Sequence, residues 1–106
     1  MTNNLAKLTN DTPMIFARKV AREFELTTRE EAIELIHIFT GNGEKDVEEV
    51  QDELKRVIST YEGLLRVKAS RGEREESVER SMAIWKQELA QIEQAVRMIN
   101  TPKGVH

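Results

Sequence analysis

Cysteine is absent from this chain of 106 residues. Disulfide bonds and thiolate zinc sites are therefore excluded, and the composition fits a reducing compartment. No apolar run approaches the roughly 20 residues that are needed to cross a bilayer, and the start of the chain lacks the pattern of a signal peptide. We therefore expect a cytoplasmic protein without a membrane span or a membrane partner.

Aromatic residues, proline and glycine are scarce as well. Aromatics make up 5% of the chain, and there are two prolines and five glycines, whereas 33% of the residues are charged. This balance is typical of helical assemblies, and no alternation of β-branched residues indicates a strand. The net charge of −3 argues against a large phosphate-binding surface, although local clusters of Lys and Arg have to be considered separately. We predict a single all-α domain.

The first predicted helix follows an N-terminal tail of residues 1–11, which we expect to be flexible. Asp11 and Thr12 precede Pro13, which is a typical helix start because a side-chain oxygen can accept a hydrogen bond from a free amide and proline needs no amide partner. The helix is predicted to reach about Leu26. Its apolar stripe, which we expect to be buried, consists of Ile15, Phe16, Val20 and Phe24. Its charged residues, which we expect to face solvent, are Arg18, Lys19, Arg22 and Glu23.

A second short helix completes the N-terminal part, residues 12–43. Thr28 and Glu31 have the spacing of a capping box, so this helix is predicted to begin near Arg29. Its many apolar residues imply burial on most sides. The run of glycine, asparagine and glycine at 41–43 ends the helix, because these residues tolerate the left-handed conformation that closes helix C-termini.

Residues 44–100 carry two runs of apolar residues at alternating spacings of three and four. This is the heptad pattern of helices that pack side by side. The first run consists of Val47, Val50, Leu54, Val57, Tyr61 and Leu64. The second run consists of Val78, Met82, Trp85, Leu89, Ile92, Val96 and Ile99. Each run therefore predicts a long helix that needs a helical partner.

Two structures are compatible with the region between these runs. The positions that continue the heptad pattern, here called seam positions, are polar in this region: Lys68, Arg71 and Glu75. Because Gly72 is a natural residue for a helix end, we predict an antiparallel helical hairpin with a turn near residues 69–74. The alternative is one continuous helix of roughly 80 Å, since Leu64 and Val78 are two heptads apart and the register carries across. A short tail is predicted at residues 101–106.

Further apolar residues widen the stripe on the hairpin: Ile58, Leu65, Ile84 and Met98. Because the long helices extend beyond the short N-terminal pair, we expect this stripe to pack against a second copy in a dimeric helical bundle. Coiled-coil hairpins commonly hold partners, so we predict a non-enzymatic interaction or regulatory protein that binds another protein and needs no cofactor. The predicted partner-binding residues are Tyr61, Leu65, Trp85 and Met98.

One pattern of carboxylates points to a different function. Glu30-Glu31-x-x-Glu34 followed by Glu49-x-x-Asp52 resembles the metal-binding signature of the MazG-like all-α nucleotide pyrophosphohydrolases. The resemblance implies that adjacent helices present carboxylates to Mg²⁺, which neutralises the phosphates of a nucleotide and positions the attacking water. The ligands implied by this alternative are Glu31, Glu34, Glu49 and Asp52. The interpretation that we prefer is a solvated acidic face with i,i+4 pairs to Lys and Arg.

A second resemblance covers residues 24–47. A short apolar turn at 24–26, a central Ala32 in the next helix and a glycine–asparagine turn before the helix after it are similar to the compact three-helix UBA-like module. The resemblance implies a packing arrangement for residues 13–58, in which the alanine lets two helices approach closely. It implies no ubiquitin partner, because a shared fold does not determine function.

The predicted turn region is rich in basic residues. Its basic residues outnumber the acidic Glu73, and there are four of them: Arg66, Lys68, Arg71 and Arg74. Clustered Lys and Arg can neutralise phosphates, so a nucleic-acid-associated factor that uses this tip is the other alternative. The interpretation that we prefer is a set of solvated charges at a turn.

Overall fold

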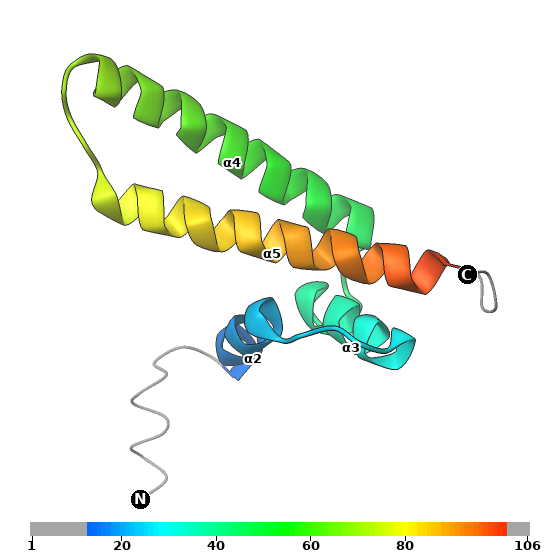
Figure 1. Ribbon diagram of the computed structural model, residues 1–106. Helices are drawn as coiled ribbons and strands as arrows, with labels where there is room; N and C mark the ends of the chain where they lie inside the picture. The colour runs from blue at the N-terminus through cyan, green and yellow to red at the C-terminus, as the bar shows by residue number, and fades with distance from the viewer. Residues whose placement is uncertain (1–12, 102–106) are drawn as a thin grey trace, which may run out of the picture.

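The computed structural model describes residues 13–101, and within this range it is all-helical. The helices are α2 (Pro13–Glu23), α3 (Arg29–Phe39), α4 (Val47–Ser70) and α5 (Glu76–Asn100). Figure 1 shows α2 and α3 as a short pair beside the long hairpin of α4 and α5, which confirms the predicted architecture. The predicted cap at Asp11 and Thr12, the N-terminal tail and most of the C-terminal tail lie outside the described residues.

The hairpin turn lies between Ser70 and Glu76, where it was predicted, and the continuous helix is wrong. Gly72 has a φ of +75°, which glycine adopts without strain. The amide of Gly72 donates to the carbonyl of Ala69 at 2.9 Å, and the amide of Glu73 donates to the carbonyl of Lys68 at 2.9 Å. This pair of bonds is the Schellman motif, which satisfies the last carbonyls of α4 and reverses the chain.

Helix α5 is central, because α4 packs along one side of it and α2 and α3 pack on the other (Figure 1). The core between these elements consists of Ala21, Leu26, Ala32, Leu35, Phe39, Val50, Leu54, Ile92 and Ala95. Phe39 and Ile92 are its largest fully buried side chains. Ala32 and Ala95 are both 0% exposed, and such small side chains allow the backbones of neighbouring helices to approach closely. The hairpin is therefore anchored at one end by the short helices.

The predicted orientation of α2 is wrong. Three residues of the apolar stripe that was expected to be buried are exposed: Phe16 by 51%, Val20 by 49% and Phe24 by 41%. The side chain of Ile15, the fourth, lies outside what the structure describes. The face that packs against the rest of the fold instead contains Ala21, which is 2% exposed, and arginines that were expected to face solvent. The position of α2 is consequently determined by polar contacts to α5 as much as by burial of apolar surface.

A buried carboxylate on α5 explains this orientation. Glu88 is only 4% exposed, and it forms ion pairs with Arg18 and with Arg22, the latter at 3.4 Å. Arg18 also donates to the carbonyl of Phe39 at 3.3 Å, and its guanidinium lies over the Phe39 ring, 5.6 Å from the ring centroid. Because a buried charge is costly unless it is paired, α2 must turn its arginines toward α5.

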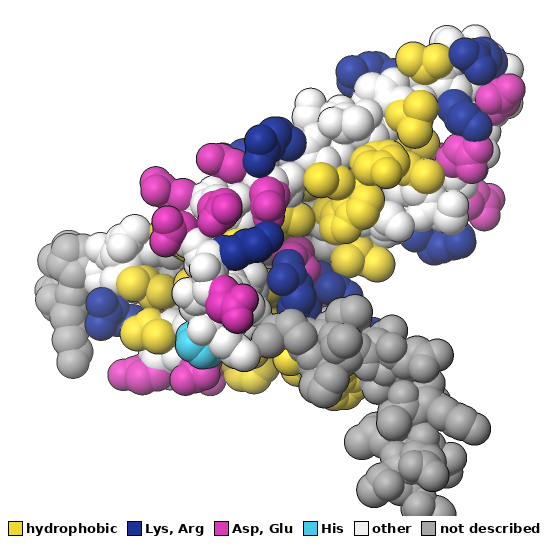
Figure 2. Space-filling model, turned by 180° about the vertical axis from the view of Figure 1, so that it is seen from behind, with side chains coloured by type: hydrophobic (Ala, Val, Ile, Leu, Met, Phe, Trp, Pro, Cys, Tyr) yellow, Lys and Arg dark blue, Asp and Glu magenta, His cyan; other side chains and the backbone are white. Residues whose placement is uncertain are grey.

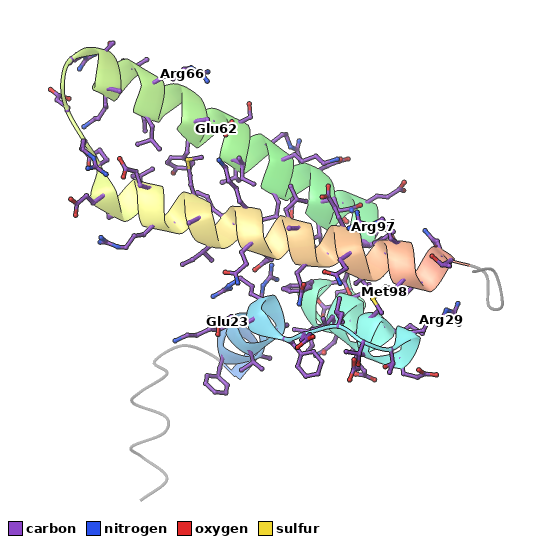
Figure 3. The ribbon with its side chains drawn as sticks, in the orientation of Figure 1. Glu23, Arg29, Glu62, Arg66, Arg97 and Met98 are labelled. Atoms are coloured by element: carbon purple, nitrogen blue, oxygen red, sulfur yellow. The ribbon has the colours of Figure 1, made fainter. Side chains whose placement is uncertain are left out.

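Side chains also donate hydrogen bonds to backbone carbonyls at helix ends, and these bonds connect the short helices to the hairpin. The side-chain amide nitrogen of Gln91 donates to the carbonyl of Ala21 at 3.0 Å and to the carbonyl of Phe24. Both carbonyls lie where α2 ends. Arg29 Nε, at the start of α3, donates to the carbonyl of Ile99 at 3.1 Å, near the end of α5 (Figure 3). These contacts fix the ends of α2 and α5 against neighbouring elements.

The capping box at the start of α3 is confirmed. Thr28 Oγ1 accepts from the amide of Glu31 at 3.1 Å, and the Glu31 carboxylate accepts from the amide of Thr28 at 3.1 Å. Glu31 also accepts from the amide and the hydroxyl of Thr27, each at 2.9 Å. These donors, above all the Thr27 amide, hold the pKa of Glu31 below its ordinary value.

The cap therefore makes stability depend on pH. Because its folded pKa is lowered, Glu31 stabilises the fold above the ordinary glutamate pKa, and this stabilisation is lost as the pH falls through the lowered value. Thr27→Val removes one donor and is expected to raise the pKa of Glu31 and to shrink the acid-dependent part of the unfolding free energy. An NMR titration of the Glu31 carboxyl measures this, with Ser59→Ala, at an exposed position of α4, as the control. An unchanged pKa in Thr27→Val would show that the hydroxyl contributes nothing.

Candidate functional site

The part of the hairpin near the turn extends beyond α2 and α3, which cover only its other end (Figure 1). Large apolar side chains are uncovered there: Leu64 is 44% exposed, Val67 is 49% exposed and Ile84 is 41% exposed. Figure 2 shows hydrophobic side chains in a run along this part of the hairpin. We call this surface the distal stripe and define it as Val57, Tyr61, Leu64, Val67, Ile84 and Trp85. Contiguous apolar surface of this kind marks interaction sites in many proteins.

The centre of the distal stripe is an aromatic pair. The rings of Tyr61 on α4 and Trp85 on α5 have their centroids 5.3 Å apart and are tilted by 43°. Tilted pairs at this distance are favourable beyond the area that they bury. Both side chains remain partly exposed, so the pair joins the two helices and still presents aromatic surface.

Two adjoining hollows lie between the distal stripe and α2. The larger has a volume of about 520 Å³ and the smaller about 250 Å³, and both are lined by Arg18, Leu54 and Trp85. The larger is also lined by Lys45 and Glu53, which form an ion pair at 3.1 Å. Because Arg18 is held in an ion pair as well, much of the charge around the hollows is compensated locally. The hollows thus combine the apolar side chains of Leu54 and Trp85 with charged side chains that are largely paired.

The four predicted partner-binding residues do not form one cluster. Tyr61 and Trp85 are in contact, and Leu65 is half-buried one turn further along α4. Met98 packs against the core at the other end of α5, thirteen residues or about 20 Å from Trp85. Of the four predicted residues, the structure therefore brings Tyr61 and Trp85 into contact and leaves Met98 far from them.

Sequence reasoning missed one residue of the stripe and misplaced another. Val67 belongs to neither heptad run, although it lies three residues after Leu64 and so faces the same way. Ile58 was expected to widen the exposed stripe, but it is 8% exposed and belongs to the buried face of α4. The helical spacing of three residues from Leu64 is the signal in the sequence that indicates Val67.

The four carboxylates of the predicted magnesium site are not brought together. The Glu31 carboxylate is engaged in the cap of α3, and Glu34 is exposed on the same helix. Glu49 and Asp52 are exposed on α4. In the part of the chain that the structure describes, no three His, Asp or Glu side chains are grouped so that they could hold a metal ion.

The basic hairpin tip is partly neutralised. Lys68 lies 2.5 Å from Glu75, and Arg74 lies 2.6 Å from Glu79. Hydrogen bonds to these carboxylates raise the pKa of Lys68 and of Arg74, and Arg74 lowers the pKa of Glu79. The two remaining basic residues of the predicted set are exposed: Arg66 and Arg71. Half of the predicted phosphate-binding charges are therefore occupied within the tip.

No family model, curated protein or solved structure was found to match this chain. The MazG-like and UBA-like resemblances remain predictions. Between residues 13 and 101, no helix is both long enough and apolar enough to span a bilayer.

Proposed function

We propose that this chain is a non-enzymatic protein-interaction protein that uses the distal stripe to bind the helices of a second copy. The proposal is supported by the large apolar side chains that remain uncovered in this part of the hairpin. Helices with a heptad seam gain stability when a partner helix covers their exposed apolar side chains. In this arrangement the two hairpins together form a helical bundle that can present further surfaces to other proteins.

One row of residues along α4 and its C-cap, Arg71, carries the proposal. Its members are Glu53, Val57, Thr60, Leu64, Val67 and Arg71. Successive members are four, three, four, three and four residues apart, so they share one helix face, and all six are exposed or half-buried. The row is acidic at the base of the hairpin, apolar in the middle and basic at the tip.

This row is complementary to itself in the antiparallel direction. Its spacing is the same from either end, so a two-fold axis at the level of residue 62 pairs each member with another member on the second copy. Val57 then lies opposite Val67, and Thr60 lies opposite Leu64. Glu53 lies opposite Arg71 at both ends of the interface. Complementary charges of this kind fix the register and the direction of association.

The first test is the mass of the full-length protein in solution, measured by sedimentation equilibrium over a range of concentrations. The wild type is expected to dimerise. Leu64→Glu is expected to weaken the dimer by about a hundredfold or more, because each copy loses a buried leucine worth about 1.5 kcal/mol or more. Ile33→Glu on α3 is the matched control, since Ile33 is 45% exposed and Leu64 is 44% exposed. A monomeric wild type at all concentrations would refute the proposal.

A charge exchange tests the antiparallel register. Arg71→Glu alone and Glu53→Arg alone are each expected to weaken the dimer several-fold, because each places two like-charged pairs in the interface and an exposed pair is worth roughly 0.2–1 kcal/mol. The double variant restores opposite charges at both ends and is expected to recover most of the lost affinity. Additive losses in the double variant would exclude this register.

A further inference from the structure

The exposed apolar face of α2 forms one wall of a groove. This groove has a volume of about 590 Å³ and runs between α2 and α3. Its apolar lining includes Phe16 and Val20 from α2, Phe24 just after α2, and Leu35 and Ile38 from α3. Figure 3 shows side chains, aromatic rings among them, on the side of α2 and α3 that faces away from α5. The groove is thus separate from the distal stripe.

The groove has the residue pattern of a helix-binding site. Phe16 and Val20 are one turn apart on α2, so their side chains lie in line, and Phe24 follows directly after the helix ends; each of the three is at least 41% exposed. Two neighbouring helices with an apolar furrow between them accept a third helix, whose apolar residues at i, i+3, i+4 and i+7 enter the furrow. The ends of α2 and α3 are fixed by Gln91 and Arg29, so both walls are preformed.

The charge on the groove selects its partner. Glu30, Glu31 and Glu34 of α3 line it, and no basic side chain of the described residues does. Glu30 and Glu34 are exposed one turn apart on α3. Lys or Arg residues beside the apolar stripe of an incoming helix would pair with these carboxylates, whereas acidic residues there would be repelled.

We propose that this groove binds an amphipathic helix whose apolar stripe is flanked by Lys and Arg, supplied by a partner protein other than this chain. The amphipathic α2 of a second copy fits less well, because its Arg18 and Arg22 are already paired with the buried Glu88. The inference goes beyond self-association through the distal stripe, since it concerns a different surface and a different partner.

The first experiment uses two synthetic helical peptides of 18 residues. Both have Leu at i, i+3, i+4 and i+7; one has Lys at the flanking positions and its twin has Glu. Fluorescence anisotropy with the full-length protein is expected to show binding of the Lys peptide, and at least about tenfold weaker binding of the Glu twin. Val20→Glu is expected to lower affinity for the Lys peptide about tenfold, because it places a charge among the apolar anchors. Ile33→Glu, outside the groove, is the matched control and should change affinity less than about twofold.

A charge reversal separates specific pairing from general attraction. The variant with Glu30→Lys and Glu34→Lys is expected to prefer the Glu peptide. The control variant, with Glu48→Lys and Asp52→Lys on exposed positions of α4, has the same net charge and is expected to keep its preference for the Lys peptide. Equal behaviour of the two variants would overturn the proposal, because the attraction would then follow net charge alone.

Two other outcomes would also overturn the proposal. If Val20→Glu lowers the mass of the protein in solution, the groove is occupied by a second copy. If Leu5→Ser with Leu8→Ser raises affinity for the Lys peptide, the occupant is the N-terminal segment of the chain itself. Failure here is distinguishable from failure of the dimer, because Leu64→Glu should leave peptide binding unchanged and Val20→Glu should leave the mass unchanged.

Discussion

Replacement of Phe39 by alanine is expected to destabilise the fold by about 3–5 kcal/mol. Phe39 is 1% exposed, at the end of α3, and belongs to the cluster that contains Ile92 of α5. The variant would lose the transfer free energy of a whole aromatic ring, and a cavity would remain between helices that cannot collapse freely. It would also remove the surface over which the Arg18 guanidinium lies. Urea denaturation of the variant and the wild type measures the difference.

The matched control for this substitution is Phe16→Ala on α2. It removes the same ring, but Phe16 is 51% exposed, so the expected loss is about 0.5 kcal/mol or less. The comparison also tests the orientation of α2. If Phe16→Ala costs as much as Phe39→Ala, the apolar face of α2 is buried in solution, by this chain or by a second copy, and the groove between α2 and α3 is not open to a partner.

The hairpin could be predicted from the sequence because its signals are local. The heptad runs specify two helices, and the polar seam positions with Gly72 specify where the chain reverses. The capping box of Thr28 and Glu31 is equally local, since all its donors and acceptors lie within a few residues. Features of this kind need no knowledge of the neighbouring helix.

The orientation of α2 could not be predicted, because its amphipathic pattern identifies two faces but does not say which one meets the rest of the fold. We assigned the apolar face to the core, as hydrophobic burial alone would dictate. The decision depends on Glu88 and Gln91, which are distant in sequence and occupy positions on α5 where charged and polar residues usually face solvent. The groove was missed for the same reason, since it exists only because α2 is turned.

The distal stripe was predicted in part. Tyr61 and Trp85 were predicted as partner-binding residues, and the structure places their rings in contact across the hairpin. The seam did not predict how far α4 is rotated about its axis. The buried residues of α4 are Val50, Leu54 and Ile58, which are four residues apart, so the buried face moves round the helix until Ile58 lies about 120° from Leu64. That rotation buries Ile58 and leaves the row from Glu53 to Arg71 uncovered.

Glu88 connects α2 to the hairpin through its ion pairs, and it therefore also fixes the position of one wall of the groove. Its side chain is 5% exposed, whereas those of Arg18 and Arg22 are 30% and 16% exposed. Removal of one partner from a buried ion pair costs about 3–5 kcal/mol, because the remaining charges stay desolvated and unpaired. Since the two arginines keep some contact with water, we expect a somewhat smaller loss for Glu88→Gln, about 2–4 kcal/mol.

Urea denaturation of Glu88→Gln tests this value, and Glu62→Gln is the matched control. Glu62 forms an exposed ion pair with Lys86 at 3.1 Å, so its replacement should cost less than about 1 kcal/mol. A triple variant with Glu88→Leu, Arg18→Met and Arg22→Met removes all three charges together and is expected to be close to the wild type in stability. If Glu88→Gln is as stable as the wild type, α2 does not depend on this ion pair. If Glu88→Gln is destabilised as expected and the triple variant is not, the desolvated, unpaired charge is the cause of the loss. Only Glu88→Gln should then also weaken binding of the Lys peptide.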